Sequence, residues 1–172
     1  SISYLGRLDP SKGVIDLVKA FEIYKNDNPI SKIVLNIAGS GKQSNEIEKL
    51  IKDNSSIRFF GPLAYHQIDD YLNKSHFTII PSKYDNLPTV GLESLMNQTP
   101  LLISNAKGLA DYLEEGKDCF KFDPNVDDIV ALFKRVESNF DTIEQMSRNA
   151  RNTFLEKFSI SNYCEDLVKI IE

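Results

Sequence analysis

The sequence predicts an α/β domain of three layers, in which helices cover both faces of a parallel sheet of six strands. Short apolar, β-branched runs alternate with amphipathic segments along the chain. Strands that are apolar throughout, separated by helices, are typical of a parallel sheet that is covered on both faces. A length of 172 residues fits one domain. We therefore expect a doubly wound, Rossmann-like domain that binds ligands at the carboxyl ends of its strands.

Six segments have the apolar character of buried strands. They are residues 1–5, 33–38, 57–60, 77–80, 101–104 and 119–122. Gly39, Gly61 and Pro81 follow three of these segments and mark their ends, since glycine and proline interrupt regular structure. Because the first strand starts with the first residue, we expect the chain to be a fragment of a longer protein.

The segments between the strands place apolar residues three and four positions apart, as helices do. The expected helices cover residues 13–25, 44–52, 67–74, 89–97 and 109–114. A helical region follows from about residue 126 to the end, with breaks near Asn139 and Ser159. Asp141 and Glu144 have the spacing of a capping box, which predicts a helix start after the first break.

Composition restricts the classes of function. The chain has 20 basic and 25 acidic residues, which argues against nucleic-acid binding but leaves room for one local phosphate site. No apolar run approaches the length of a membrane-spanning helix, so no direct membrane span is expected. Cys119 and Cys164 are too few for a disulfide framework, and we expect packed thiols in a reducing, cytoplasmic compartment.

The loop after the first strand carries the first candidate site. Gly6 allows the backbone to approach a ligand closely, and Arg7 and Lys12 flank a turn that leads into a helix. Two cations beside the free N–H groups of a helix start form a clamp for a diphosphate. The alternative is a solvated loop with an ordinary basic pair.

The glycine-rich segment 39–42 (GSGK), after the second strand, resembles a phosphate loop but fails its pattern. A Walker loop needs glycine where Asn36 stands and serine or threonine where Gln43 stands. The dinucleotide fingerprint fails as well, because its third glycine falls on Ser44. We expect a tight strand-to-helix turn near the ligand and no separate nucleotide site.

Two carboxylates flank the helix start after the fourth strand. Asp85 lies in the loop, and Glu93 stands eight positions later, one turn into the helix. The N–H groups between them favour an anion such as a phosphate. Glu93 is then placed to accept hydrogen bonds from the vicinal hydroxyls of a ribose, and Asp85 from a sugar beyond the phosphates. The alternative is a turn-forming Asp85 and a surface Glu93.

Taken in order, these segments resemble the C-terminal, donor-binding domain of a GT-B glycosyltransferase of family 4. The resemblance covers nearly the whole chain. It rests on residues 6–13 (GRLDPSKG), 33–41 (IVLNIAGSG), 57–61 (IRFFG), 81–82 (PS) and 99–100 (TP), and on Asp85 and Glu93 at the spacing of the E-x7-E motif. The resemblance implies one half of a GT-B fold, over residues 1–172, and a separate N-terminal acceptor domain.

The resemblance assigns a role to each candidate position. Arg7 and Lys12 match the residues that bind the donor diphosphate, and Glu93 matches the residue that binds the ribose hydroxyls. Asp85 matches the acid that faces the transferred sugar, and Gly6 allows close approach of the phosphates. The remaining implied contacts, to the phosphates, the sugar and the nucleobase, are Leu87, Thr89, Val90, Phe60 and Leu63. The last two match the positions that pack against the nucleobase.

The implied reaction transfers a sugar from a nucleoside diphosphate to an acceptor with retained anomeric configuration. Arg7, Lys12 and Asp85 are the implied catalytic residues. Because the two cations neutralise the diphosphate, we expect no metal and no cofactor. The donor is expected to be a UDP-sugar rather than a GDP-sugar. Asp85 in place of the commoner glutamate, and residues 86–88 (NLP) in place of a small-aromatic-glycine segment, leave the sugar open.

The implied partners are the nucleotide-sugar donor and, through the N-terminal domain, an acceptor glycan, lipid or protein. Action at the inner face of a membrane is common for such enzymes. We expect this chain alone to bind a nucleotide sugar weakly and to transfer nothing. The main alternative is a non-catalytic GT-B-like subunit that supports a partner glycosyltransferase, and a GT-B epimerase or phosphorylase is a further one.

Overall fold

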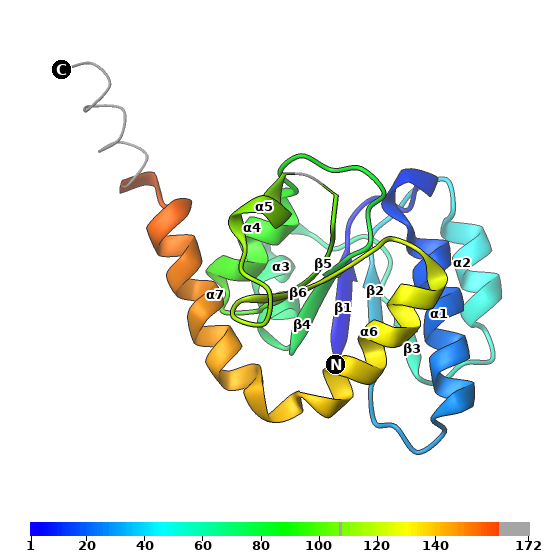
Figure 1. Ribbon diagram of the computed structural model, residues 1–172. Coiled ribbons are helices and arrows are strands. Elements are labelled where there is room, and N and C mark those ends of the chain that lie inside the picture. Colours follow the sequence, from blue (N-terminus) through cyan, green and yellow to red (C-terminus); the bar gives the residue numbers. More distant parts are fainter. Residues whose placement is uncertain (107, 162–172) are drawn as a thin grey trace.

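The computed structural model describes residues 1–106 and 108–161, and its centre is a parallel sheet (Figure 1). The strands are β1 (Ile2–Leu5), β2 (Leu35–Ala38), β3 (Ile57–Phe59), β4 (Phe77–Ile80), β5 (Leu101–Ser104) and β6 (Cys119–Phe122). They pair in the order β3-β2-β1-β4-β5-β6. The direction of this order reverses at β1 and β4, where doubly wound sheets form their ligand-binding crevice.

The helices follow the strands in alternation. They are α1 (Val14–Asp27), α2 (Ser44–Ile51), α3 (Tyr65–Asn73), α4 (Thr89–Met96), α5 (Leu109–Tyr112), α6 (Val126–Ser138) and α7 (Ile143–Lys157), with short 3-10 turns η1 (Pro10–Lys12) and η2 (Phe140–Thr142). Figure 1 shows helices on both faces of the sheet. The predicted Rossmann-like, three-layer α/β/α fold is therefore confirmed.

Two apolar cores separate the layers. On one face, α1, α2 and α6 pack against the sheet, and Phe21 of α1 meets Phe133 of α6 edge to face with ring centroids 5.3 Å apart. On the other face, Leu95 of α4 and Ala150 of α7 are completely buried against β4 and β5. A smaller cluster under α3 is centred on Leu72 and Ala38. These buried faces supply most of the driving force for folding.

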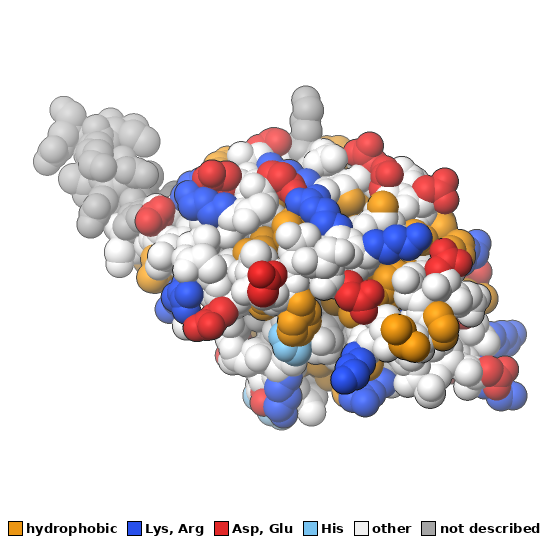
Figure 2. Space-filling view, turned by 60° about the horizontal axis from the view of Figure 1, so that its bottom comes forward, with side chains coloured by type: hydrophobic (Ala, Val, Ile, Leu, Met, Phe, Trp, Pro, Cys, Tyr) orange, Lys and Arg blue, Asp and Glu red, His pale blue; other side chains and the backbone are white. Residues whose placement is uncertain are grey.

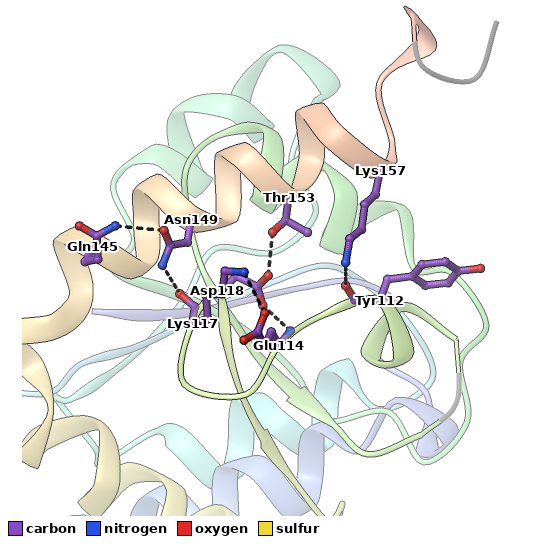
Figure 3. Close-up of polar contacts among 8 residues, drawn as sticks. All are labelled: Tyr112, Glu114, Lys117, Asp118, Gln145, Asn149, Thr153 and Lys157. Carbon is purple, nitrogen blue, oxygen red and sulfur yellow. Dashed lines mark hydrogen bonds and ion pairs between the residues drawn. The ribbon is translucent and has the colours of Figure 1, made fainter. Parts of the chain in front are cut away.

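Polar contacts attach α7 to the segment before β6 (Figure 3). Asp118, which is only 2% exposed, accepts a hydrogen bond from the Thr153 hydroxyl at 2.7 Å and one from the Glu114 N–H at 2.8 Å. Asn149 donates to the Lys117 carbonyl at 2.9 Å. The position of α7 is thus fixed by directed bonds as well as by its apolar face.

Several helix boundaries differ from the prediction: α1 runs to Asp27, two residues past its expected end, and α5 stops at Tyr112, two residues before its expected end. Helix α3 starts at Tyr65, because the Gln67 side chain accepts a hydrogen bond from the Ala64 N–H at 2.9 Å and caps the helix earlier than expected. The predicted capping box of Asp141 and Glu144 is wrong: α7 begins after Thr142 without a side-chain cap.

The two residues of that box have other roles. Asp141 lies within the turn η2, and the Glu144 carboxylate pairs with Arg148 one turn along α7 at 2.6 Å. The break near Asn139 is confirmed, and α7 ends at Lys157, close to the second expected break. The part of the expected terminal helix beyond residue 161 lies outside the described residues.

The surface charges and the one described cysteine, Cys119, match what the composition predicted. Figure 2 shows basic and acidic side chains interspersed over the face at the amino ends of the strands. Within residues 1–106 and 108–161, no helix is both long and apolar enough to cross a membrane. Cys119 is buried, and burial raises the pKa of its thiol to about 12, as expected of a packed, unreactive thiol. Cys164 lies outside the described residues.

Candidate functional site

A cavity of about 480 Å³ opens at the carboxyl edge of the sheet, between the ends of β1 and β4. This is the reversal point of the strand order, where the fold predicts a ligand. Phe60 and Leu63 are not part of its wall, but all the other predicted site residues are. The predicted residues in the wall are Gly6, Arg7, Lys12, Asp85, Leu87, Thr89, Val90 and Glu93. Residues from two loops far apart in the sequence are thus brought to one cavity.

The loop after β1 is locked onto the end of β4. Gly13 adopts a left-handed conformation (φ +71°), and a Cβ there would lie only 2.2 Å from the Pro81 carbonyl oxygen. The Lys83 N–H donates to the Ser11 carbonyl at 3.1 Å. Only glycine permits this approach, so the contact fixes where Lys12 enters the cavity.

The glycine-rich turn 39–42 supports the same loop from the other side. Gly39 has a φ of +138°, and a Cβ there would lie 1.8 Å from the Gly6 carbonyl oxygen. The Leu8 N–H donates to the Ser40 carbonyl at 2.9 Å. Among the described residues that line the cavity, none comes from this turn. The turn therefore supports the loop after β1 and does not itself contact the cavity, as expected of a segment that does not match the Walker pattern.

An ion pair crosses the cavity wall. Lys12 Nζ lies 2.6 Å from Asp85 Oδ2, and the two side chains are 21% and 20% exposed. Ser82, which is buried, donates its hydroxyl to the same carboxylate oxygen at 3.2 Å. Arg7 is 73% exposed and pairs with Asp9 at 3.4 Å. Lys12 is thus held in place, whereas the Arg7 side chain is largely in solvent.

The start of α4 forms another part of the wall. Pro88 precedes the first helical residue, and among the described side chains none caps this helix end. Thr89 and Val90, which line the cavity, are the first two residues of the helix, and their N–H groups have no partner within it, whereas the next N–H, of Gly91, already donates to the Pro88 carbonyl at 2.9 Å. These groups and the helix dipole favour a negatively charged ligand.

Glu93 lies at the cavity wall on the next turn of α4. Partial burial, followed by the nearby Asp69 carboxylate, raises the pKa of its carboxyl above the ordinary value. A carboxylate held in this way gains from hydroxyl donors, because they stabilise its charged form.

Two tyrosines position the loop after β1, and sequence reasoning assigned them no role in the site. The Tyr4 hydroxyl donates to the Arg7 carbonyl at 2.6 Å, and Tyr4 itself lines the cavity. The Tyr71 hydroxyl donates to the Tyr4 carbonyl at 2.9 Å. Burial raises the pKa of both phenols, so both remain donors. The sequence placed Tyr4 only within the first expected strand, residues 1–5.

The two predicted nucleobase contacts lie beside the cavity. Phe60 is half exposed, and its ring meets Tyr71 edge to face at 5.5 Å. Leu63 packs onto the cluster under α3, with Ile68 and Val90 of the cavity wall. Neither residue is part of the wall itself, so their contact with a base stays a prediction.

Within the described part of the chain, no group of three or more His, Cys, Asp or Glu side chains forms a metal site.

The comparisons with known proteins agree on one family. The family model described as glycosyl transferases group 1 matches residues 1–153. An uncharacterised glycosyltransferase of Methanocaldococcus jannaschii is 28% identical over 174 residues, which cover 98% of this chain and 44% of that protein. Glycogen synthase of Mycobacterium tuberculosis is 29% identical over 151 residues, which cover 86% of this chain and 36% of that enzyme.

Solved structures show the same fold. TarM of S. aureus, in a complex that includes UDP, superposes with a TM-score of 0.85 at 18% identity, over 98% of this chain and 34% of TarM. HepE of Anabaena, in complex with UDP-glucose, gives 0.82 at 17% identity, over 99% of this chain and 48% of HepE. The chain thus spans less than half the length of these relatives. Because the family model matches most of the chain, the protein belongs to the glycosyl transferases group 1 family and forms a C-terminal GT-B domain.

Proposed function

We propose that this chain is the donor-binding domain of a retaining glycosyltransferase, which transfers a sugar from a nucleoside diphosphate to an acceptor. The proposal rests mainly on the cavity at the ends of β1 and β4, whose wall combines two cations, an uncapped helix start and two carboxylates. Phosphates need the cations and the N–H groups, and sugar hydroxyls need the carboxylates.

The proposed arrangement of the donor follows the order of these groups. Lys12 and Arg7 hold the diphosphate together with the first turn of α4. Glu93 accepts hydrogen bonds from the ribose hydroxyls, and Asp85 faces the sugar. The UDP and UDP-glucose complexes of HepE, which has the same fold, support a UDP-sugar as donor.

The proposed chemistry is electrostatic. The bond between the anomeric carbon and the terminal phosphate oxygen breaks with both electrons on that oxygen, a bond to the acceptor oxygen forms, and the acceptor hydroxyl proton passes to the departing diphosphate and from there to solvent. Negative charge grows on the diphosphate, and one fixed donor at such a position contributes about 3–4 kcal/mol. Lys12 and Arg7 supply this stabilisation in the proposal, which therefore uses no metal.

The acceptor side of the reaction is assigned to an N-terminal domain. The acceptor in this proposal is a glycan, lipid or protein, and action at the inner face of a membrane belongs to the whole protein. The chain by itself binds the donor weakly and transfers nothing. Glycosyl transfer by this chain alone would contradict that part of the proposal.

Thermal shift with UDP, GDP, ADP and CMP in parallel tests the site. A ligand at 100 times its Kd stabilises by about 2.7 kcal/mol, which raises the Tm by several degrees. We expect UDP to raise the Tm of the wild-type chain. Arg7→Ala and Glu93→Ala are expected to lose the shift, whereas Arg58→Ala, on the exposed side of β3, is expected to keep it.

Two results would count against the proposal. A shift that persists in both site variants places nucleotide binding elsewhere. No shift with any nucleotide in the wild-type chain removes the support for a donor site and favours a scaffolding subunit.

A further inference from the structure

Lys12 has a carboxylate partner within the cavity wall. Its Nζ lies 2.6 Å from Asp85 Oδ2. Ser82, only 2% exposed, donates to the same oxygen at 3.2 Å, and the Ser104 hydroxyl fixes the Ser82 carbonyl at 2.6 Å. The Asp85 carboxylate is therefore anchored next to the cation that the proposed function assigns to the diphosphate.

A diphosphate held by Lys12 lies close to this carboxylate. An oxygen that accepts another N–H of Lys12 stands about 2.8 Å from Nζ, and hence within about 5.5 Å of Asp85 Oδ2. Like charges at this distance repel each other, and partial exposure weakens the repulsion without removing it. Asp85 thus opposes negative charge at the position where Lys12 attracts it.

The repulsion is stronger for the product than for the donor. In a nucleotide sugar the terminal phosphate is esterified to the sugar and carries about one negative charge. As a free monoester it carries about 1.5 to 2. When the bond to the anomeric carbon breaks, both its electrons stay on the phosphate oxygen. The hydroxyls that can donate to Asp85 leave with the sugar. The charge beside Asp85 therefore rises while its favourable contacts disappear.

We propose that Asp85 disfavours the nucleoside diphosphate left after transfer and thereby promotes its release. The inference rests on the proposed function and adds to it a role for Asp85 in selecting the intact nucleotide sugar over its product. The Lys12–Asp85 pair balances attraction and repulsion, so that the cavity binds the donor and lets the product go.

Titration calorimetry with UDP tests this role in the wild-type chain and in Asp85→Asn. The amide keeps the shape of Asp85 and an acceptor for Lys12 and Ser82, but it removes the charge. We expect Asp85→Asn to bind UDP about 3- to 30-fold more tightly, as screened repulsion of one charge predicts. UMP, which has no second phosphate, is expected to gain less.

The matched control is Asp53→Asn, which removes the same charge from the loop between α2 and β3, at the amino end of the strands. Its affinity for UDP is expected to equal that of the wild type. Asp85→Ala replaces Asp85→Asn if the amide variant fails to fold, and the same direction is expected.

The outcomes of this titration distinguish the inference about Asp85 from the proposed function. If the wild-type chain binds UDP and the Asp85 variant binds it equally or more weakly, the inference is wrong and the proposed function stands. An equal gain in Asp53→Asn also contradicts the inference, because net charge then explains it. If the wild-type chain does not bind UDP, the proposed function fails, and the inference fails with it.

Discussion

Glu93 combines a cost to stability with a proposed role in binding. Burial and Asp69 raise the pKa of its carboxyl, so the folded protein holds this proton more tightly than the unfolded chain does. The contribution of Glu93 to stability is therefore fully present below the ordinary carboxyl pKa and is lost as the pH rises through the raised value. At neutral pH its charge is disfavoured in the folded state, which leaves it ready to accept hydroxyl donors.

Glu93→Gln is expected to separate these two effects. Near pH 7 the variant is expected to be as stable as the wild type or slightly more stable, by no more than about 0.5 kcal/mol, and the difference is expected to vanish toward pH 4. UDP affinity is expected to fall about tenfold, since bonds to a charged acceptor contribute about 1.5–3 kcal/mol. Thermal melts between pH 4 and 8, with calorimetry at pH 7, check both. A variant with unchanged affinity contradicts the assigned role.

Residue types in the loops predicted most of the site. Arg7, Lys12, Asp85 and Glu93 stand out because charged residues follow apolar strands, and the structure brings all four to one cavity. Tyr4 carries no such signal, because an inward-facing tyrosine in a strand is equally compatible with a plain core residue. Its bond to the Arg7 carbonyl depends on the turn that follows the strand, which sequence spacing does not specify.

At the scale of the elements, the contact between Gly13 and the end of β4 sets the shape of the site. Gly13→Ala is expected to lower the free energy of unfolding by about 2–4 kcal/mol, because left-handed backbone strain adds to a clash with the Pro81 carbonyl. Gly116 is the matched control: its φ is +77°, but a Cβ there would meet nothing within 4 Å.

Gly116→Ala is expected to cost only the strain, about 1–2 kcal/mol. Urea denaturation measures both variants, and calorimetry shows whether Gly13→Ala also weakens UDP binding by displacing Lys12. Equal losses of stability in the two variants would show that the packing of Gly13 onto β4 contributes nothing.

The attachment of α7 is the second prediction at this scale. Thr153→Val keeps the volume of the side chain but removes the hydroxyl that donates to the buried Asp118 carboxylate (Figure 3). We expect a loss of about 1–3 kcal/mol in the free energy of unfolding, because a buried oxygen loses its donor. Thr142→Val, at the exposed start of α7, is expected to change it by less than about 0.5 kcal/mol. If Thr153→Val is as stable as the control, the Thr153–Asp118 hydrogen bond does not help to hold α7 in place.

Elements with a strong apolar pattern were predicted closely, and their ends less so. The strands β4, β5 and β6 have the expected bounds, because each is a short, mostly apolar run bordered by polar residues or proline. The capping box at Asp141 failed because Glu144 has a competing partner in Arg148, and such side-chain competition is not visible in a spacing rule. Helix α3 started early for a related reason, since Gln67 caps it.

At the scale of the whole molecule, the alternation of strands and helices determined the layers but not the strand order. The reversal between β1 and β4 is what brings Lys12 and Asp85, 73 positions apart, to within 2.6 Å of each other. The sequence alone suggested this meeting only through the resemblance to a known family. The nucleobase contacts at Phe60 and Leu63 depend on the ligand itself and stay predictions.

The most direct test of the account is the binding of UDP to Lys12→Ala and Lys42→Ala, measured by titration calorimetry. Both lysines follow the carboxyl end of a strand, but only Lys12 lines the cavity. We expect Lys12→Ala to weaken UDP binding about tenfold or more, since it removes a charge-assisted bond, and Lys42→Ala to bind UDP as the wild type does. Equal affinity in Lys12→Ala and the wild type would contradict the proposed donor site, and a loss confined to Lys42→Ala would place the phosphate site at the glycine-rich turn instead.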